Sequence, residues 1–157
     1  MARNFGIDLQ ASGVAMACAQ TKHTEFSPMP KYATKMAWEK RYARLDFTYR
    51  YGDVFRSGDI VLLEKAYGQS RNAQTTLMQL FGIFIAGVYV SGARIEEINT
   101  GTWKKLVLGS GRATKEDVLL FAEEKLARKL KTQDEADAYC ISLACEMLYP
   151  IENGDTK

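Results

Sequence analysis

The fold is decided first by residues 5–20, whose sequence is FGIDLQASGVAMACAQ. Two short apolar runs, residues 5–8 and 14–20, lie on either side of the polar segment 10–13. Apolar runs separated by a segment with serine and glycine predict two β-strands joined by a turn. Asp8 ends the first run, in surroundings where a carboxylate is unusual because an unpaired buried charge is costly.

Beyond this hairpin, the hydrophobic pattern alternates between strand and helix periods. It predicts a helix over residues 31–56, a strand over 60–64, a helix from 72 or 73 to 91, a strand over 94–98, and helices over 116–129 and 134–148. Residues 27–30 indicate a break, 65–71 a loop, 100–115 a loop with a short helix, and residues from 150 onward a flexible tail. This order predicts a single α/β domain over residues 1–157.

Two of these helices carry further expectations. In the first, Met36, Tyr42, Leu45 and Tyr49 form an apolar stripe that we expect to face the core. The later half of the second is apolar on most sides, which predicts burial on more than one face and contact with a second subunit. We expect a buried helix here and no membrane span, because the apolar stretch is short and contains glycines.

The composition limits the chemistry. A chain of 157 residues, 46% of them apolar and 25% charged, is typical of a soluble globular protein with one core. The only histidine, His23, falls in a predicted polar turn, which excludes Ser-His and Cys-His mechanisms that need a buried base. The cysteines lie in apolar stretches without metal-type spacing, and no signal peptide precedes Asp8. We therefore expect reduced core thiols and a cytoplasmic protein.

Basic residues are clustered, although the net charge is only +2. The clusters are Lys31, Lys35, Lys40, Arg41 and Arg44; Lys104, Lys105, Arg112 and Lys115; and Arg128, Lys129 and Lys131. Each cluster is either a phosphate-binding face or a solvated helix face, and the sequence alone does not choose between the two.

Three more acidic residues share the unusual setting of Asp8. Glu64 ends the strand predicted over 60–64, and Asp134 and Asp137 open the last helix, where a spacing of three places both on one face. If the two strands are neighbours, their carboxyl ends and the helix start meet at one point. Carboxylates that close repel one another unless cations lie among them, and oxygen ligands without histidine favour Mg²⁺ or Mn²⁺. Two such ions form the usual clamp for in-line attack on phosphodiesters.

At these residues the chain resembles the RuvC family of Holliday-junction resolvases, in the RNase H-like superfamily. Four motifs in the same order carry the resemblance: FGID at 5–8 with GVA at 13–15, IVLLE at 60–64 with residues 72–73 and 77–82, WKKLVLGSGRATK at 103–115, and DEADA at 134–138. The resemblance covers nearly the whole chain. It implies an RNase H-like mixed β-sheet flanked by α-helices, and a homodimer that cuts two opposing strands of a four-way DNA junction.

The resemblance also implies the metal ligands. Asp8, Glu64, Asp134 and Asp137 match the family's acidic residues, which hold two Mg²⁺ ions per active site, with Asp8 bridging both. We expect Mn²⁺ to substitute for Mg²⁺. Glu135 falls on another face of the helix and is not matched to a ligand.

DNA-contacting residues follow from the same resemblance. Tyr67 matches an aromatic residue that enters the junction and stacks on bases, a contact worth roughly 1–3 kcal/mol per base. Lys104 and Lys115 match lysines that contact phosphate near the scissile bond, where positive charge assists the transition state. Lys105 and Arg112 would contact the DNA backbone.

Departures from the family and rival interpretations leave the substrate open. Many bacterial members carry Asp-Pro-Gly where this chain has Asp8-Leu9-Gln10, and the short body between the motifs is closer to bacteriophage members, which implies looser junction specificity. Rivals that use the same fold are a nuclease for branched DNA in general, a ribonuclease H acting on RNA–DNA hybrids, and a non-catalytic DNA-binding protein. A structural alternative treats Asp134 as a helix N-cap and Asp8 as a turn residue.

Overall fold

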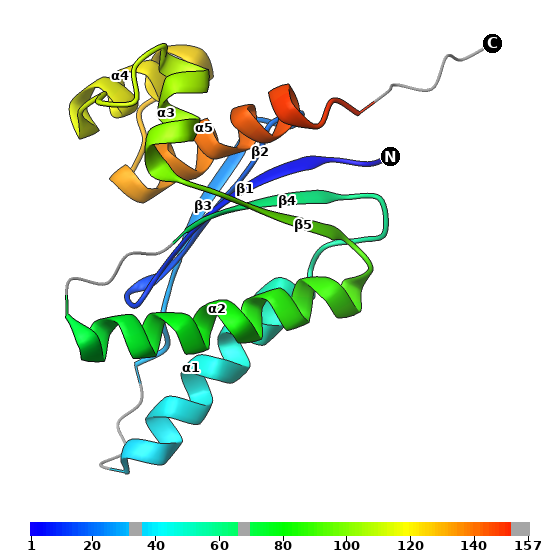
Figure 1. The fold of residues 1–157 in the computed structure, drawn as a ribbon, viewed down its shortest axis with the longest axis vertical. Coiled ribbons are helices and arrows are strands. Elements are labelled where there is room, and N and C mark those ends of the chain that lie inside the picture. Colours follow the sequence, from blue (N-terminus) through cyan, green and yellow to red (C-terminus); the bar gives the residue numbers. More distant parts are fainter. Residues whose placement is uncertain (32–35, 66–69, 152–157) are drawn as a thin grey trace.

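The chain folds around a mixed five-stranded sheet, and the computed structural model describes residues 1–31, 36–65 and 70–151 (Figure 1). The strand order is β3-β2-β1-β4-β5, with β1 (Asn4–Gln10), β2 (Gly13–Cys18), β3 (His23–Pro28), β4 (Ile60–Glu64) and β5 (Arg94–Ile98). β2 pairs antiparallel with both β1 and β3, whereas β4 runs parallel to both β1 and β5. The predicted α/β class with a mixed sheet is confirmed.

Helices cover both faces of the sheet (Figure 1). One layer contains α1 (Ala37–Gly52) and α2 (Arg71–Ser91), and the other contains α3 (Thr100–Leu108), α4 (Lys115–Leu126) and α5 (Gln133–Leu148). Because successive strand residues point to opposite faces, β1 contributes to both layers. Phe5, Ile7 and Leu9 pack in the core beneath α1 and α2, whereas Gly6 and Asp8 face α5.

Gly6 sets the distance between α5 and the sheet. A Cβ atom at this position would lie 2.2 Å from the Ala138 carbonyl oxygen and 2.2 Å from the Ser142 nitrogen. Any larger residue would therefore clash with the backbone of α5, which a side-chain rotation cannot relieve. This close approach holds the first turns of α5 beside the end of β1.

The strand β3 is not predicted by the sequence pattern, which indicates a polar turn around His23 and a break at residues 27–30. β3 is an edge strand with little apolar character, and Thr24 is its only buried residue. Its polar groups find partners far away in the sequence: the Thr24 hydroxyl donates to Glu135, and Glu25 accepts a hydrogen bond from the Tyr51 hydroxyl. Tertiary pairing therefore makes a strand that local alternation does not indicate.

Several predicted element boundaries are also wrong. β1 extends two residues beyond Asp8, because Leu9 and Gln10 pair with Val14 and Gly13 in a tight hairpin. The helix predicted over residues 31–56 is shorter, spanning Ala37–Gly52, and β2 ends at Cys18. The region 100–115 holds the predicted short helix, α3, and the helix predicted from 116 begins at Lys115, after the Thr114 capping box.

The predicted apolar stripe of α1 is buried only in part. Leu45 packs against the core, whereas Tyr42 is 67% exposed and the N-cap residue Met36 is 55% exposed. The buried residues of α1 are Ala43, Thr48 and Gly52. The small residues let α1 cross α2 closely: a Cβ atom at Gly87 of α2 would lie 2.4 Å from a carbonyl oxygen of α1. Close helix crossing selects small residues at the contact, and larger ones are left outside it.

α2 has one buried face and one exposed apolar face. Leu80, Phe81, Phe84 and Val88 are buried, whereas Met78, Tyr89 and Val90 are exposed. By length and composition, α2 is the one helix among the described residues that could cross a membrane, yet it packs against α1 and the sheet. The three cysteines are free and buried, as expected.

Candidate metal centre

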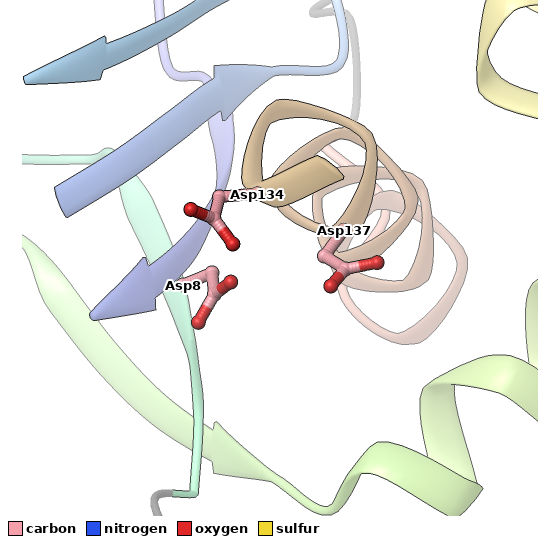
Figure 2. Close-up of side chains that lie close together, drawn as sticks. All are labelled: Asp8, Asp134 and Asp137. Carbon is pink, nitrogen blue, oxygen red and sulfur yellow. The ribbon is translucent and has the colours of Figure 1, made fainter. Parts of the chain in front are cut away.

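Three aspartate carboxylates face one another where β1 meets the start of α5 (Figure 2). Asp8 comes from β1, and Asp134 and Asp137 come from the first two turns of α5. One carboxylate oxygen from each residue lies within 4.8 Å of the others. Asp8 is only 6% exposed, and the other two are partly buried. The predicted convergence of these acids is thus present for the three aspartates.

The start of α5 excludes the structural alternative for Asp134. The N-cap of α5 is Thr132, whose side chain accepts from the Glu135 backbone nitrogen while the Glu135 side chain accepts from the Thr132 backbone nitrogen. Asp134 therefore does not cap the helix. The capping side chains are those of Thr132 and Glu135, and Glu135 lies on another face of the helix. Asp8 is not a turn residue either, because it pairs with Ala15 inside the β1–β2 ladder.

Glu64 lies on the wall of the same cleft but outside the group of mutually close aspartates. It ends β4, which is paired with β1 as predicted. Its Oε1 atom accepts a hydrogen bond from the Trp103 indole nitrogen at 3.0 Å and another from the Thr100 hydroxyl. Sequence analysis missed these two residues as partners of Glu64. The pairing of Glu64 with Ile98 in β5 brings the segment just after β5 beside it.

The acids interact electrostatically across the cleft. The pKa of Asp8 is raised from 3.8 to about 8, mainly by burial and then by the negative charge of Glu64. The pKa of Asp137 is raised from 3.8 to about 6, again mainly by burial, with Lys104 acting in the opposite direction. Without a cation, the buried cluster therefore favours a protonated carboxyl at Asp8.

Two glutamine amides donate hydrogen bonds to the aspartates. Gln10 Nε2 lies 2.9 Å from Asp8 Oδ2 and 2.9 Å from Asp134 Oδ1. Gln133 Nε2 lies 3.1 Å from Asp137 Oδ1. Sequence analysis missed both glutamines, although Gln10 is two residues from Asp8 in a strand and so shares its face.

Asp8, Glu64 and Asp137 line a cleft of about 640 Å³ that also contains two of the predicted lysines. Lys104 and Lys115 both lie on its wall, and Lys104 Nζ donates to the Ala113 carbonyl oxygen at 2.9 Å. Lys105 lies on a separate shallow surface beside Leu106, and neither Lys105 nor Arg112 is among the described residues that line the acidic cleft. Tyr67 lies outside the described residues.

The donor chemistry of this cluster fits a hard divalent cation. All ligand atoms on offer from the three aspartates and Glu64 are carboxylate oxygens, which Mg²⁺ and Mn²⁺ prefer. A cation would also balance the charges that raise the pKa of Asp8. The residues present therefore suit such an ion.

The sheet order and the helical layers match the fold of solved RuvC structures. The chain is similar to "Thermus thermophilus RuvC structure", with a TM-score of 0.66 and 19% identity, over 94% of this chain and 95% of that chain. It is also similar to "T. thermophilus RuvC in complex with Holliday junction substrate", with a TM-score of 0.71 and 18% identity, over 93% of each chain. No protein-family model and no curated protein matches the sequence. At this identity, the likeness establishes the fold.

Proposed function

We propose that this protein is a metal-dependent DNA endonuclease that resolves four-way junctions by paired nicks in opposing strands. The observation that carries the proposal is the cluster of three close aspartates, with Glu64, Lys104 and Lys115 on the wall of the adjoining cleft, in a RuvC-type fold. One of the similar structures, Thermus thermophilus RuvC, is a complex with a Holliday junction substrate. That complex supports the choice of branched DNA as the substrate class.

The four acidic residues would hold the ions, two per site. Asp8, Asp134 and Asp137 would supply the central oxygens, and Glu64, held by Trp103 and Thr100, would supply the opposite wall. Bound Mg²⁺ or Mn²⁺ would supply charge neutralisation at the phosphate and activation of water for hydrolysis.

Lysines in the cleft would position the phosphate. Lys104 and Lys115 are the predicted lysines on the cleft wall, and the charge of Lys104 already acts on Asp137. A fixed positive charge close to the reacting phosphate stabilises the negative charge that develops there. Lys105 and Arg112 lie outside the cleft lining, where they would contact the backbone of a DNA arm, and Tyr67 would stack on bases.

A basic surface on α1 extends from the acidic cleft and supports DNA binding. A groove of about 380 Å³, lined by Lys31, Lys40 and Arg44, shares Ala11 with the cleft. A second groove, of about 220 Å³ between α1 and α2, shares Lys40 and Arg44 with the first and adds Arg41. Among the described residues, none of these four cations forms a salt bridge. They are therefore available to DNA phosphates.

The exposed apolar face of α2 supports a homodimer. Tyr89 is 80% exposed and Val90 is 64% exposed, near the C-terminal end of the helix. A Cβ atom at Gly82, on the same helix, would meet no atom within 4 Å, so none of the described residues covers that position. A second copy of α2 would cover this face, and paired nicks require two active sites.

The test is a comparison of substrates with Mg²⁺: a synthetic four-way junction, linear duplex, a flap and an RNA–DNA hybrid. We expect symmetric paired nicks on the junction. Asp8→Asn and Glu64→Gln should abolish cleavage yet leave junction binding largely intact, and Asp53→Asn, which changes an exposed carboxylate outside the cleft, should cut normally. Cleavage of the hybrid alone would indicate a ribonuclease H. Equal cleavage of flaps would indicate a general branched-DNA nuclease, and no cleavage at all would refute the proposal.

A further inference from the structure

Gln10 holds a special position among the aspartates. It is the last residue of β1, and its side chain lies on the same face as that of Asp8. The two N–H groups of one amide are shared between two carboxylates, Asp8 from the sheet and Asp134 from α5, at 2.9 Å each. At the cluster itself, the Gln10 side chain thus links the two elements that supply the aspartates, β1 and α5.

We propose that Gln10 is a placeholder at this centre: its amide holds Asp8 and Asp134 together without a cation and is displaced when a divalent cation binds. The inference rests on the proposed function, because it takes the aspartates to be cation ligands. The hydrogen bonds of Gln10 would raise the concentration of free cation that is needed to fill the site.

The physical reason lies in what an amide can and cannot supply. Without a cation, the two hydrogen bonds from Gln10 hold the side chains of Asp8 and Asp134 side by side. The amide carries no net charge, so a divalent cation stabilises the two ionised carboxylates far more than the amide does. The lone pairs that accept from Gln10 are unavailable to a cation at the same time. Binding therefore breaks hydrogen bonds that a residue without a donor would never have made.

Gln133 provides a contrast within the same centre. It donates to one carboxylate only, Asp137, four residues further along the same helix. It joins no separate elements, and the second oxygen of Asp137 receives no hydrogen bond from it. Loss of the Gln133 donor should therefore change cation affinity much less than loss of the Gln10 donor.

The experiment is a titration of the full-length chain with Mn²⁺ by calorimetry, without DNA. Gln10→Met keeps most of the side-chain volume and removes the donor, so we expect its dissociation constant for Mn²⁺ to fall at least about tenfold, given two hydrogen bonds to charged groups. Gln133→Met is the matched control and should show a clearly smaller fall, since it loses only one such bond. Circular dichroism checks that the variants are folded, and Gln10→Ala repeats the test if Gln10→Met is not.

Each outcome has a distinct meaning. An unchanged or higher dissociation constant in Gln10→Met, with Mn²⁺ bound by wild type, would overturn the placeholder role and leave the proposed function intact. An equal fall in Gln133→Met would also overturn it, because any lost donor would then suffice. A wild-type protein that binds no Mn²⁺ would instead overturn the proposed function on which the inference rests.

Discussion

Replacing Asp8 by asparagine should stabilise the metal-free protein, and increasingly so as the pH rises. The pKa of Asp8 is about 8 in the folded chain because the carboxyl is buried beside Glu64, against 3.8 without these surroundings. Below pH 3.8 the carboxyl is protonated in both states and stability is unaffected. As the pH rises above 3.8, the unfolded chain loses its proton and the folded chain keeps it, so folding becomes less favourable until about pH 8.

The magnitude follows from the separation of the two pKa values. At about 1.4 kcal/mol per pKa unit, the Asp8 carboxyl lowers the free energy of unfolding by about 4 kcal/mol at pH 7. Between pH 5 and pH 8, the effect grows by about 4 kcal/mol. Asparagine has no charge to bury, and its side-chain oxygen can still accept the hydrogen bond from Gln10. The stability gap between Asp8→Asn and wild type should therefore widen across this pH range.

The assay is urea denaturation in the presence of a chelator, at pH 5 and at pH 8. Asp53→Asn, an exposed aspartate on the other side of the sheet, is the control and should show no such widening. Saturating Mg²⁺ should stabilise wild type and leave Asp8→Asn little changed, so the stability gap between the two proteins should narrow. A gap that stays constant with pH, or a wild type more stable than Asp8→Asn at pH 8 without metal, would refute the reasoning.

Three further predictions concern other parts of the molecule. Gly6→Ala should lower the free energy of unfolding in urea by more than about 2 kcal/mol and abolish Mn²⁺ binding, because its Cβ would lie 2.2 Å from the α5 backbone. The control Gly82→Ala, whose Cβ would lie in open space, should unfold no more easily than wild type. The double change Lys40→Gln and Arg44→Gln should weaken junction binding and reduce the slope of log K against log salt by about 2, as measured by fluorescence anisotropy, while Arg50→Gln, outside the grooves, should have little effect. Tyr89→Glu should convert a dimer into a monomer of 17.6 kDa in light scattering, and Leu120→Glu, exposed on α4, should remain dimeric; a wild type that is already monomeric would contradict the proposed α2 interface.

The local sequence pattern was sufficient to predict most of the helices and strands, because the residues that favour each of them lie close together in the chain. The apolar run of β4 and the glycine-containing turn after β1 predict their own structure. β3 could not be predicted in this way, because Thr24 and Glu25 are polar residues whose partners, Glu135 and Tyr51, lie on distant elements. The buried face of α1 was predicted only in part, at Leu45, for a similar reason: small residues at a helix crossing leave no hydrophobic signature.

The residues of the candidate site also fall into two groups: those that the sequence pattern singles out and those that only the fold brings to the site. Asp8, Glu64, Asp134 and Asp137 stand out in the sequence because a charge at the edge of an apolar run is chemically unusual wherever it occurs. The sequence does not single out the residues that hydrogen-bond to these acids, which are Gln10, Gln133, Thr100 and Trp103. An amide, a hydroxyl or an indole is common in any sequence context, and its role depends on the group that it contacts in the fold.

The sequence by itself determined the α/β class, the order of its elements and the acidic residues that any cation site would use. The tertiary structure decided which of those acids meet. Close contact of α5 with Gly6 brings Asp134 and Asp137 close to Asp8. The pairing of β4 with β5 places Glu64 within hydrogen-bond distance of Thr100 and Trp103, outside the group of three aspartates. Residue type can be inferred from local chemistry, whereas distances between carboxylates depend on packing between elements far apart in the chain.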